Sequence, residues 1–396
     1  MASTTMKKFD VIVLGVGSMG AATCYYLAKE GLSVLGLEQF DIPNELSSHT
    51  GQSRLIRKAY FEHPAYVPLL QKAYENWAHL ENISNEKVYH ETGLLYFGKA
   101  GSKLINGIHE SASKYQIQLD TIDEPDLHQR YPSFHMPAGY VSFLEPRAGF
   151  ITPEKAIRLY TGKAKALGAS IKQNTIVLAW EKTEDGIMVQ TKEQDFYAAK
   201  LVITAGPWAG KLAPALSPLL TVTRQKIWWV NTTDNNSFSL GKFPCWIIAD
   251  DNWPGIFYGF PILPSALFEG PQGFKLAWHY PGEVINPDNK YDHIPGLDEE
   301  MNIRFMDQFF PGVYTNTLAT KTCLYTNTPD EHFIIDFLPG YKKEIVIAAG
   351  FSGHGFKFAS AIGEILSDLV VHGSTEISIE FLNISRFTES IYFQSL

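Results

Sequence analysis

Short apolar runs alternate along the chain with longer stretches of helical spacing. Residues 9–14 (FDVIVL) form an apolar run that ends in glycines, residues 17–30 have helical spacing, and residues 33–38 (SVLGLE) form a second apolar run. This order predicts a strand, a helix and a parallel strand, which together make one βαβ unit. Helical spacing returns at about 64–81, and a candidate strand follows at 93–97.

A helix start signal lies at residues 152–154. Thr152, Pro153 and Glu154 supply a capping hydroxyl, a proline for the first turn and an acid favoured by the helix dipole, so we expect a helix to about Leu167. Further elements are expected from the same patterns. Strands are predicted at 186–191 and 200–204, antiparallel sheet over the aromatic stretch 226–280, a buried strand at 344–349 and a closing helix at 355–371.

This arrangement places dinucleotide-fold patterns at both ends of the chain and an aromatic, β-rich portion between them. We therefore predict an α/β fold in which a discontinuous Rossmann-like domain carries an inserted antiparallel β-rich substrate domain. The predicted nucleotide domain comprises residues 1–90, 150–222 and 323–396, and the predicted substrate domain comprises residues 91–149 and 223–322.

Charge and composition narrow the function classes. Lys plus Arg number 33 and Asp plus Glu number 42 in 396 residues, a formal net charge of −9 without a basic stripe, so no nucleic-acid partner is expected. The apolar runs are too short to span a bilayer, so no membrane partner is expected either. Cys24, Cys245 and Cys323 lie far apart, which predicts no metal site. With neither a secretory signal nor a peroxisomal tripeptide, we expect a cytoplasmic protein.

A glycine fingerprint follows the first predicted strand. Gly15-x-Gly17-x-x-Gly20 lies between strand and helix, and Glu38 follows at the end of the second strand. Such glycines permit a tight turn, the helix N-terminus accepts a pyrophosphate, and the acid accepts hydrogen bonds from ribose hydroxyls. A glycine turn without a cofactor is the alternative. A carboxylate at this position disfavours a 2′-phosphate, so NAD and FAD both remain open.

Two more buried strands end in glycine turns. They are residues 203–208 (ITAGPW) and residues 348–350 (AAG). Three turns of this kind would surround a long, extended cofactor better than a nicotinamide dinucleotide, although they can also be ordinary loops. The pattern therefore favours FAD over NAD.

The C-terminal third contains two long motifs, residues 322–336 (TCLYTNTPDEHFIID) and 349–358 (AGFSGHGFKF). Together with residues 53–60 (SRLIRKAY), 206–208 (GPW) and 258–261 (YGFP), they resemble the monomeric sarcosine oxidase family. That family includes N-methyltryptophan oxidase and the peroxisomal sarcosine and pipecolate oxidases. The resemblance covers nearly the whole chain.

The resemblance implies a monomeric flavoenzyme that oxidises a secondary amino acid such as sarcosine. In that family the N–CH₃ or ring C–N bond is oxidised to an imine, and electrons pass from FAD to O₂ to give H₂O₂. Water then hydrolyses the imine, which releases formaldehyde and a primary amino acid from N-methyl substrates. The family's FAD is attached through its 8α-methyl group to a cysteine sulfur, and the matching position here is Cys323.

The resemblance also implies roles for individual side chains. Arg57 and Lys357 match the residues that bind the substrate carboxylate, Arg54 matches one at the flavin face, and Lys275 matches a lysine that promotes the reaction with O₂. Further positions complete the predicted site. Tyr258, Tyr325 and His279 are assigned to the catalytic cavity, and Ser18, Met19, Ser48, Val177, Gly206, Trp208, Gly353 and Gly355 to the cofactor.

Three of these positions have simpler interpretations. Arg54 and Arg57 share a face if their segment is helical, and they could equally be a solvated surface pair. Lys275 shares one face of its predicted strand with His279, and that face could be the wet one. Cys323 follows Lys321 in a polar segment, where a partly exposed, cationic setting would favour the thiolate, and it could also be a structural cysteine.

The resemblance departs from the bacterial members at Thr50 and Gln52, where those proteins carry histidine and aspartate. This leaves the identity of the amine open. Two other functions fit parts of the sequence. An NAD-linked dehydrogenase of a small amino or hydroxy acid accounts for the fingerprint and Glu38, and a non-catalytic dinucleotide-binding module accounts for the glycines alone.

Overall fold

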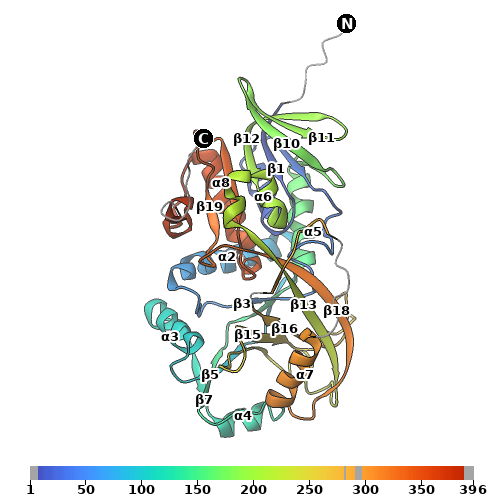
Figure 1. Cartoon of the computed structure of the whole chain (residues 1–396), viewed down its shortest axis with the longest axis vertical. Coiled ribbons are helices and arrows are strands. Elements are labelled where there is room, and N and C mark those ends of the chain that lie inside the picture. Colours follow the sequence, from blue (N-terminus) through green and yellow to red (C-terminus); the bar gives the residue numbers. More distant parts are fainter. Residues whose placement is uncertain (1–7, 281, 290–296, 388–396) are drawn as a thin grey trace.

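The computed structural model describes residues 8–280, 282–289 and 297–387. Its first sheet, in the upper half of Figure 1, has five parallel strands in the order β9-β2-β1-β12-β20. The apolar runs form this sheet because its central strands are covered on both faces. These strands are β1 (Lys8–Leu14), β2 (Val34–Leu37), β9 (Ser170–Lys172), β12 (Asp195–Ile203) and β20 (Ile345–Ala349).

Antiparallel strands extend this sheet and helices pack against it. β10 (Val177–Thr183) and β11 (Gly186–Thr191) form a hairpin on β12, and β19 (Ile334–Phe337) pairs with β20. α1 (Ser18–Lys29) contacts both α5 (Pro153–Ala166) and α8 (Ala359–His372), and α8 also packs against α2 (Val67–Ser84).

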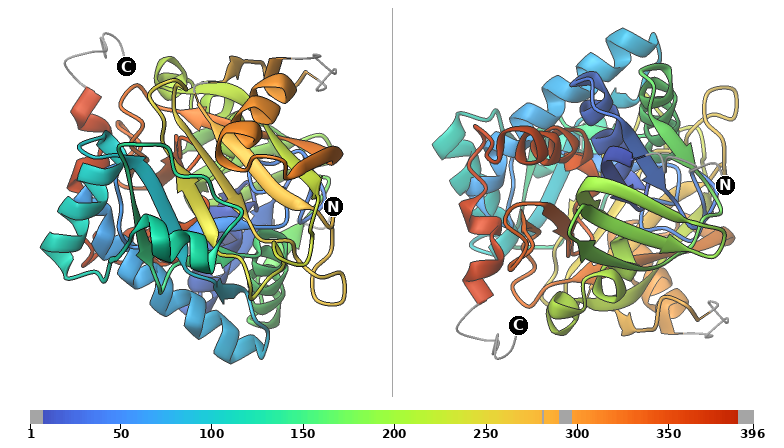
Figure 2. Two further views of the ribbon diagram at one scale, coloured as in Figure 1. Left: turned by 90° about the horizontal axis from the view of Figure 1, so that it is seen from below. Right: turned by 90° about the horizontal axis from the view of Figure 1, so that it is seen from above.

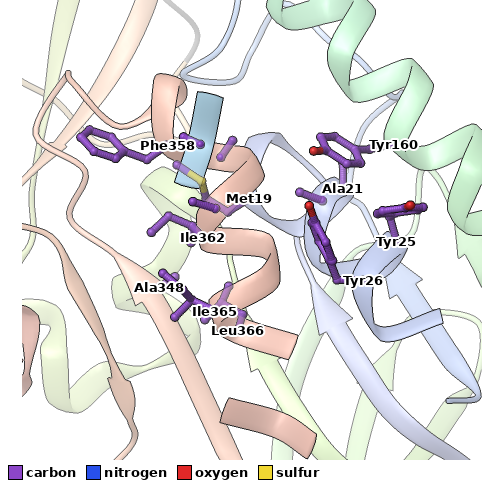
Figure 3. Close-up of a cluster of buried hydrophobic side chains, with 14 of the residues drawn as sticks. Met19, Ala21, Tyr25, Tyr26, Tyr160, Ala348, Phe358, Ile362, Ile365 and Leu366 are labelled. Carbon is purple, nitrogen blue, oxygen red and sulfur yellow. The ribbon is translucent and has the colours of Figure 1, made fainter. Parts of the chain in front are cut away.

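A buried apolar cluster joins these helices to the sheet. Figure 3 shows Ile362 of α8 beside Met19, and Tyr160 of α5 beside the α1 tyrosines. A side chain at Gly363 would overlap Ala22, so α1 and α8 approach closely there. The first turn of α1, which carries the glycine fingerprint, is therefore held by packing on several sides.

The second sheet, in the lower half of Figure 1, has nine strands in the order β17-β13-β16-β15-β14-β5-β7-β6, with β18 also paired to β13. Figure 2 shows the same arrangement from below and from above the view of Figure 1. The strands are β5 (Leu94–Lys99), β6 (Asp120–Ile122), β7 (Tyr140–Glu145), β13 (Thr221–Thr232), β14 (Cys245–Ile248), β15 (Ile256–Phe260), β16 (Phe274–His279), β17 (Glu283–Val284) and β18 (Tyr314–Asn327).

Smaller elements complete the second half of the structure. The helices α3 (Lys103–Tyr115), α4 (Glu124–Arg130) and α7 (Leu297–Phe309) belong to this part, and α6 (Ala209–Leu212) follows β12. A third, small sheet is formed by β3 (Arg54–Ile56), β8 (Gly149–Ile151) and β4 (Tyr89–Glu91). Within the described residues, no helix is long and apolar enough to cross a membrane.

The predicted α/β fold with a second, β-rich sheet is confirmed. One detail of the aromatic stretch is different, because β14 pairs in parallel with β5 while its other neighbours are antiparallel. The domain boundary predicted at residue 323 falls inside β18, which stays paired with β13 up to Asn327. The segment of Arg54 and Arg57 is not helical, because Arg54 begins the strand β3, so the condition for a shared helix face is not met.

Candidate active site

A cavity of about 440 Å³ extends from the glycine fingerprint to the second sheet. Gly15, Gly17 and Glu38 line one end, and Arg57 and Tyr258 line the other. Gly20, Lys275 and Cys323 are not among the residues that line the cavity. The other predicted site residues that line the cavity are Ser18, Met19, Ser48, Arg54, Val177, Gly206, Trp208, His279, Tyr325, Gly353, Gly355 and Lys357.

The glycine turn is shaped by close backbone contacts. Gly15 has φ +87°, and a Cβ atom there would lie 2.7 Å from the carbonyl oxygen of Thr204 at the end of β12. A Cβ atom at Gly20 would overlap the carbonyl oxygen of Gly15. These positions therefore require glycine, and the turn leaves the N-terminus of α1 open to the cavity.

Gly20→Ala should disrupt this turn and with it the binding of the cofactor. The added methyl group meets backbone atoms that cannot rotate away, so the turn and the start of α1 must shift. We expect the purified variant to retain little of the FAD that the family resemblance implies, measured as flavin absorbance per protein. The control is Gly162→Ala in α5, where the Cβ atom meets nothing within 4 Å. That change should keep the flavin and stabilise the helix by up to about 1 kcal/mol; equal flavin content in both variants would contradict the assignment.

Glu38 and His49 show that the nucleotide end suits a polar ligand. The Glu38 carboxylate accepts hydrogen bonds from the backbone N–H groups of Val16 at 2.8 Å and Phe40 at 3.1 Å. Burial raises its pKa. A carboxylate has further acceptor positions, which ribose hydroxyls can use. His49 lines the same cavity, and its buried Nε2 has no hydrogen-bond partner within the described residues.

Arg57 is buried at the substrate end and is paired with a carboxylate. Its Nη2 donates to both oxygens of Glu62, at 2.7 and 2.8 Å, and its Nη1 donates to the carbonyl of Ala59 at 2.9 Å. The guanidinium also lies 4.3 Å from the ring centroid of Tyr60. This excludes the interpretation of Arg57 as a solvated surface arginine.

Glu62 also lines the cavity and was missed by the sequence analysis. It lies in the loop after β3, where no periodicity or motif marked it. Burial raises the pKa of Glu62, but the charge and hydrogen bond of Arg57, together with Lys357 and His354, outweigh burial and lower this pKa to about 2. Because this pKa is below the ordinary value, the pair stabilises the fold above about pH 4.5, and the stabilisation is lost as the pH falls towards 2.

Glu62→Gln should therefore destabilise the protein at neutral pH and reduce its sensitivity to acid. Removing one member of a buried ion pair costs about 3 kcal/mol, because the other charge stays buried. The free energy of unfolding, measured by urea denaturation at pH 7 and pH 3, tests both effects. Asp251→Asn is the control, because its pair with Lys99 is exposed and should cost less than about 1 kcal/mol. Equal losses in the two variants would show that the Arg57–Glu62 pair has no special weight.

Lys357 lies beside Arg57 in a short 3₁₀ turn, Phe356–Phe358, that precedes α8. It is buried, and its Nζ donates to the carbonyl of His354 at 2.7 Å. Burial and the nearby positive charge of Arg57 lower the pKa of Lys357 to about 7. At pH 7 Lys357 is therefore only partly protonated, and an anion bound between Lys357 and Arg57 would favour the charged form of Lys357.

Lys275 and Arg54 contact the same loop, residues 48–53. Lys275 is 1% exposed, which excludes the wet-face interpretation. Its Nζ donates to the carbonyls of Gly51 and Ser53, each at 2.6 Å. Arg54 donates to the carbonyls of Ser53 and Ser48, at 3.0 and 3.2 Å, and to that of Thr50. His279 lies on the same face of β16, and its Nδ1 is 3.1 Å from the hydroxyl of Tyr325.

The setting of Cys323 differs from the prediction. Cys323 is 2% exposed, not partly exposed, and burial raises the pKa of its thiol. The charges of Arg54 and Lys275 oppose this shift. Cys323 packs in a small cluster with Tyr325, and its neighbour Leu324 lines the cavity. The cationic neighbours that the sequence placed at Lys321 are therefore supplied by two other segments of the chain.

A dinucleotide-binding fold, a long cavity that starts at its glycine turn and buried basic side chains at the far end are typical of a dinucleotide-dependent oxidoreductase that acts on an anionic substrate. The chain matches the FAD dependent oxidoreductase family over residues 10–369 and belongs to it. This membership decides between the two open cofactors in favour of FAD. More narrowly, the protein is an oxidoreductase of the sarcosine oxidase and N-methyl-amino-acid oxidase type.

Individual relatives show how far the similarity extends. Monomeric sarcosine oxidase of Bacillus sp. (strain NS-129) is 36% identical over 96% of this chain and 97% of its own. N-methyl-L-tryptophan oxidase of Yersinia pestis (strain Pestoides F) is 32% identical over 96% of this chain and 99% of its own. Among solved structures, one similar structure is the open form of NikD, an unusual amino acid oxidase essential for nikkomycin biosynthesis. It is 25% identical to this chain, has a TM-score of 0.80, and the match covers 96% of this chain and 98% of NikD.

Proposed function

We propose that this protein oxidises a secondary amino acid, N-methylated or cyclic, to an imine and passes the electrons to O₂, giving H₂O₂. The observation that carries the proposal is the pair of buried cations, Arg57 and Lys357, at the end of the cavity remote from Glu38. FAD bound along the cavity supplies the two-electron acceptor. The names of the relatives support a monomer and a small amino acid as substrate.

The substrate carboxylate would bind between Arg57 and Lys357. The guanidinium offers a planar fork and the ammonium a point charge. In this structure Glu62 occupies the fork of Arg57, so a bound carboxylate competes with Glu62 for that position. The carboxylate does not react, so its binding to Arg57 and Lys357 serves to hold the reacting carbon and nitrogen of the substrate in position.

The amine end of the substrate would face a mostly apolar wall. Leu55 of β3, Ile247 of β14, and Ile256 and Tyr258 of β15 line the cavity. Ile247 and Tyr258 are direct cross-strand partners, and Ile256 lies opposite His279. Burial lowers the pKa of His279 to about 4, so this histidine is neutral at pH 7. A wall without a fixed charge favours the neutral amine, the form that can be oxidised.

Two further parts of the proposal concern the cofactor. Cys323, beside the cavity wall and under the influence of Arg54 and Lys275, would attach to the 8α-methyl group of FAD. Lys275, whose ammonium is held by two carbonyls, would provide positive charge near the site where O₂ is reduced.

Peroxide release from a substrate panel tests the proposal. Sarcosine, N-methyl-tryptophan, pipecolate and proline should be compared with N-methylated amines of similar size that lack the carboxylate. We expect at least one secondary amino acid to release peroxide, and the matched amine to react roughly 100-fold more slowly in kcat/KM because Arg57 and Lys357 have nothing to bind. Turnover of no secondary amino acid would count against the proposal.

A further inference from the structure

The loop of residues 48–53 is held between opposite charges on its two sides. One oxygen of Glu154, in the first turn of α5, accepts hydrogen bonds from the N–H groups of Gly51 at 2.8 Å and Gln52 at 3.1 Å. The carbonyl groups of the same loop accept from Arg54 and Lys275. The N–H groups and the C=O groups of the loop therefore have partners of opposite charge.

Two consecutive peptide groups connect these charges one to one. The peptide group between Thr50 and Gly51 donates its N–H to Glu154 and accepts from Arg54 at its C=O. The next peptide group, between Gly51 and Gln52, donates its N–H to Glu154 and accepts from Lys275 at its C=O. Each peptide is thus polarised by a carboxylate at one end and a cation at the other, which strengthens both hydrogen bonds.

The backbone of this loop is fixed in an unusual conformation. Gly51 has φ +116° and Gln52, a residue with a side chain, has φ +72°. The Gln52 side chain is pinned at both ends, because it accepts from Trp229 at 3.0 Å and donates to the carbonyl of Glu269 at 3.0 Å. Such strain persists only where the surroundings determine the conformation, and here it directs both peptides between the charges.

Glu154 is a negative charge beside a loop that also contacts the positive charges of Arg54 and Lys275. Lys275 is buried, and its pKa is lowered by this burial and by the nearby positive charge of Arg54. Glu154 is the carboxylate that opposes this repulsion at Lys275, and it acts on His49 as well. Its effect reaches the two cations through the two peptide groups.

We propose that Glu154 is the counter-ion of Arg54 and Lys275, acting through the two peptide groups of Thr50–Gln52, and that it holds both cations in position behind and along the cavity wall. Glu154 is a positioning residue, because it touches the loop and not the reacting atoms. Its effect on catalysis rests on the proposed function, in which Lys275 assists the reaction with O₂.

The kinetic test compares Glu154→Gln and Glu154→Ala in the flavin-loaded enzyme. Glutamine can still accept both N–H hydrogen bonds but carries no charge. If Glu154 acts as a counter-ion, Glu154→Gln should therefore be as impaired as Glu154→Ala. We expect reoxidation by O₂, followed by stopped-flow absorbance, to slow by roughly tenfold in both variants. Anaerobic flavin reduction should change less than about twofold, because the substrate-binding cations are elsewhere. Normal reoxidation in Glu154→Gln would overturn the proposal. The matched control, Glu124→Gln in the first turn of α4, should change neither step.

A double-mutant cycle on unfolding tests the same contact without any turnover. Glu154→Gln should lower the midpoint of urea unfolding, and by less than half as much when Lys275→Met is already present. Additive shifts would overturn the proposal. If Lys275→Met does not fold, Arg54→Met takes its place, because the other peptide group leads to Arg54. Failure of every substrate to reduce the flavin would instead count against the proposed function alone.

Discussion

Cys323→Ser is expected to yield a protein from which acid releases all of its flavin. Serine has nearly the same size, so the buried cluster around position 323 stays packed, but its hydroxyl is not a nucleophile at neutral pH. The wild-type protein should instead keep its yellow colour in the acid precipitate. Flavin absorbance in the pellet and in the supernatant measures the difference.

The matched control for this change is Cys245→Ser. Cys245 is equally buried, and burial raises its pKa to about 12, but it lies in β14 beside Thr92. Covalent flavin should be unaffected in this variant. Because burial also raises the pKa of Cys323 while Arg54 and Lys275 oppose the shift, attachment in the reconstituted protein should accelerate as the pH rises. Release of flavin from the wild type by acid would refute attachment.

Arg57→Met combined with Glu62→Gln is expected to reduce kcat/KM for the amino acid substrate by roughly 10²–10³-fold. The double change avoids leaving the carboxylate of Glu62 buried without a partner. Loss of a buried, charged hydrogen-bonding partner costs about 3–4 kcal/mol, which corresponds to that factor. Steady-state kinetics should show the loss mainly in KM, because Arg57 binds a part of the substrate that does not react.

Two comparisons make this result specific. Arg158→Met removes an arginine whose partner, Glu269, is 88% exposed, and it should leave kcat/KM unchanged. Amines that lack the carboxylate should react equally slowly with the wild type and the double variant. A similar loss of kcat/KM for both kinds of substrate would show that Arg57 shapes the cavity and does not bind the carboxylate.

The sequence predicted those parts of the site that depend on local geometry. The fingerprint glycines lie at the junction of β1 and α1, Glu38 directly follows β2, and Lys275 and His279 both lie in β16, as the local patterns predicted. The surroundings of Cys323 depend on contacts between segments far apart in sequence. Its cationic neighbours come from β3 and β16, which no pattern near residue 323 could reveal.

The two carboxylates of the site illustrate the same limit. Glu62 belongs to the site because the loop after β3 brings it against Arg57, a contact that no sequence pattern indicates. Glu154 has the sequence pattern of an ordinary first-turn acid, and only the structure shows that it binds the N–H groups of Gly51 and Gln52. The three-residue spacing of Arg54 and Arg57 left a shared helix face possible, but pairing of β3 with β8 determines the local structure. Residue spacing alone does not determine a helix or strand where pairing with a distant segment decides the backbone conformation.

Anaerobic mixing of the wild-type protein with one secondary amino acid and with its matched amine tests the central claim most directly. That claim is a flavin in the long cavity with a carboxylate-binding pair, Arg57 and Lys357, at its far end. The account predicts that the amino acid reduces the flavin, seen as loss of its absorbance, roughly 100-fold faster than the amine lacking the carboxylate at the same concentration. Equal bleaching by both compounds, or by neither, would contradict it.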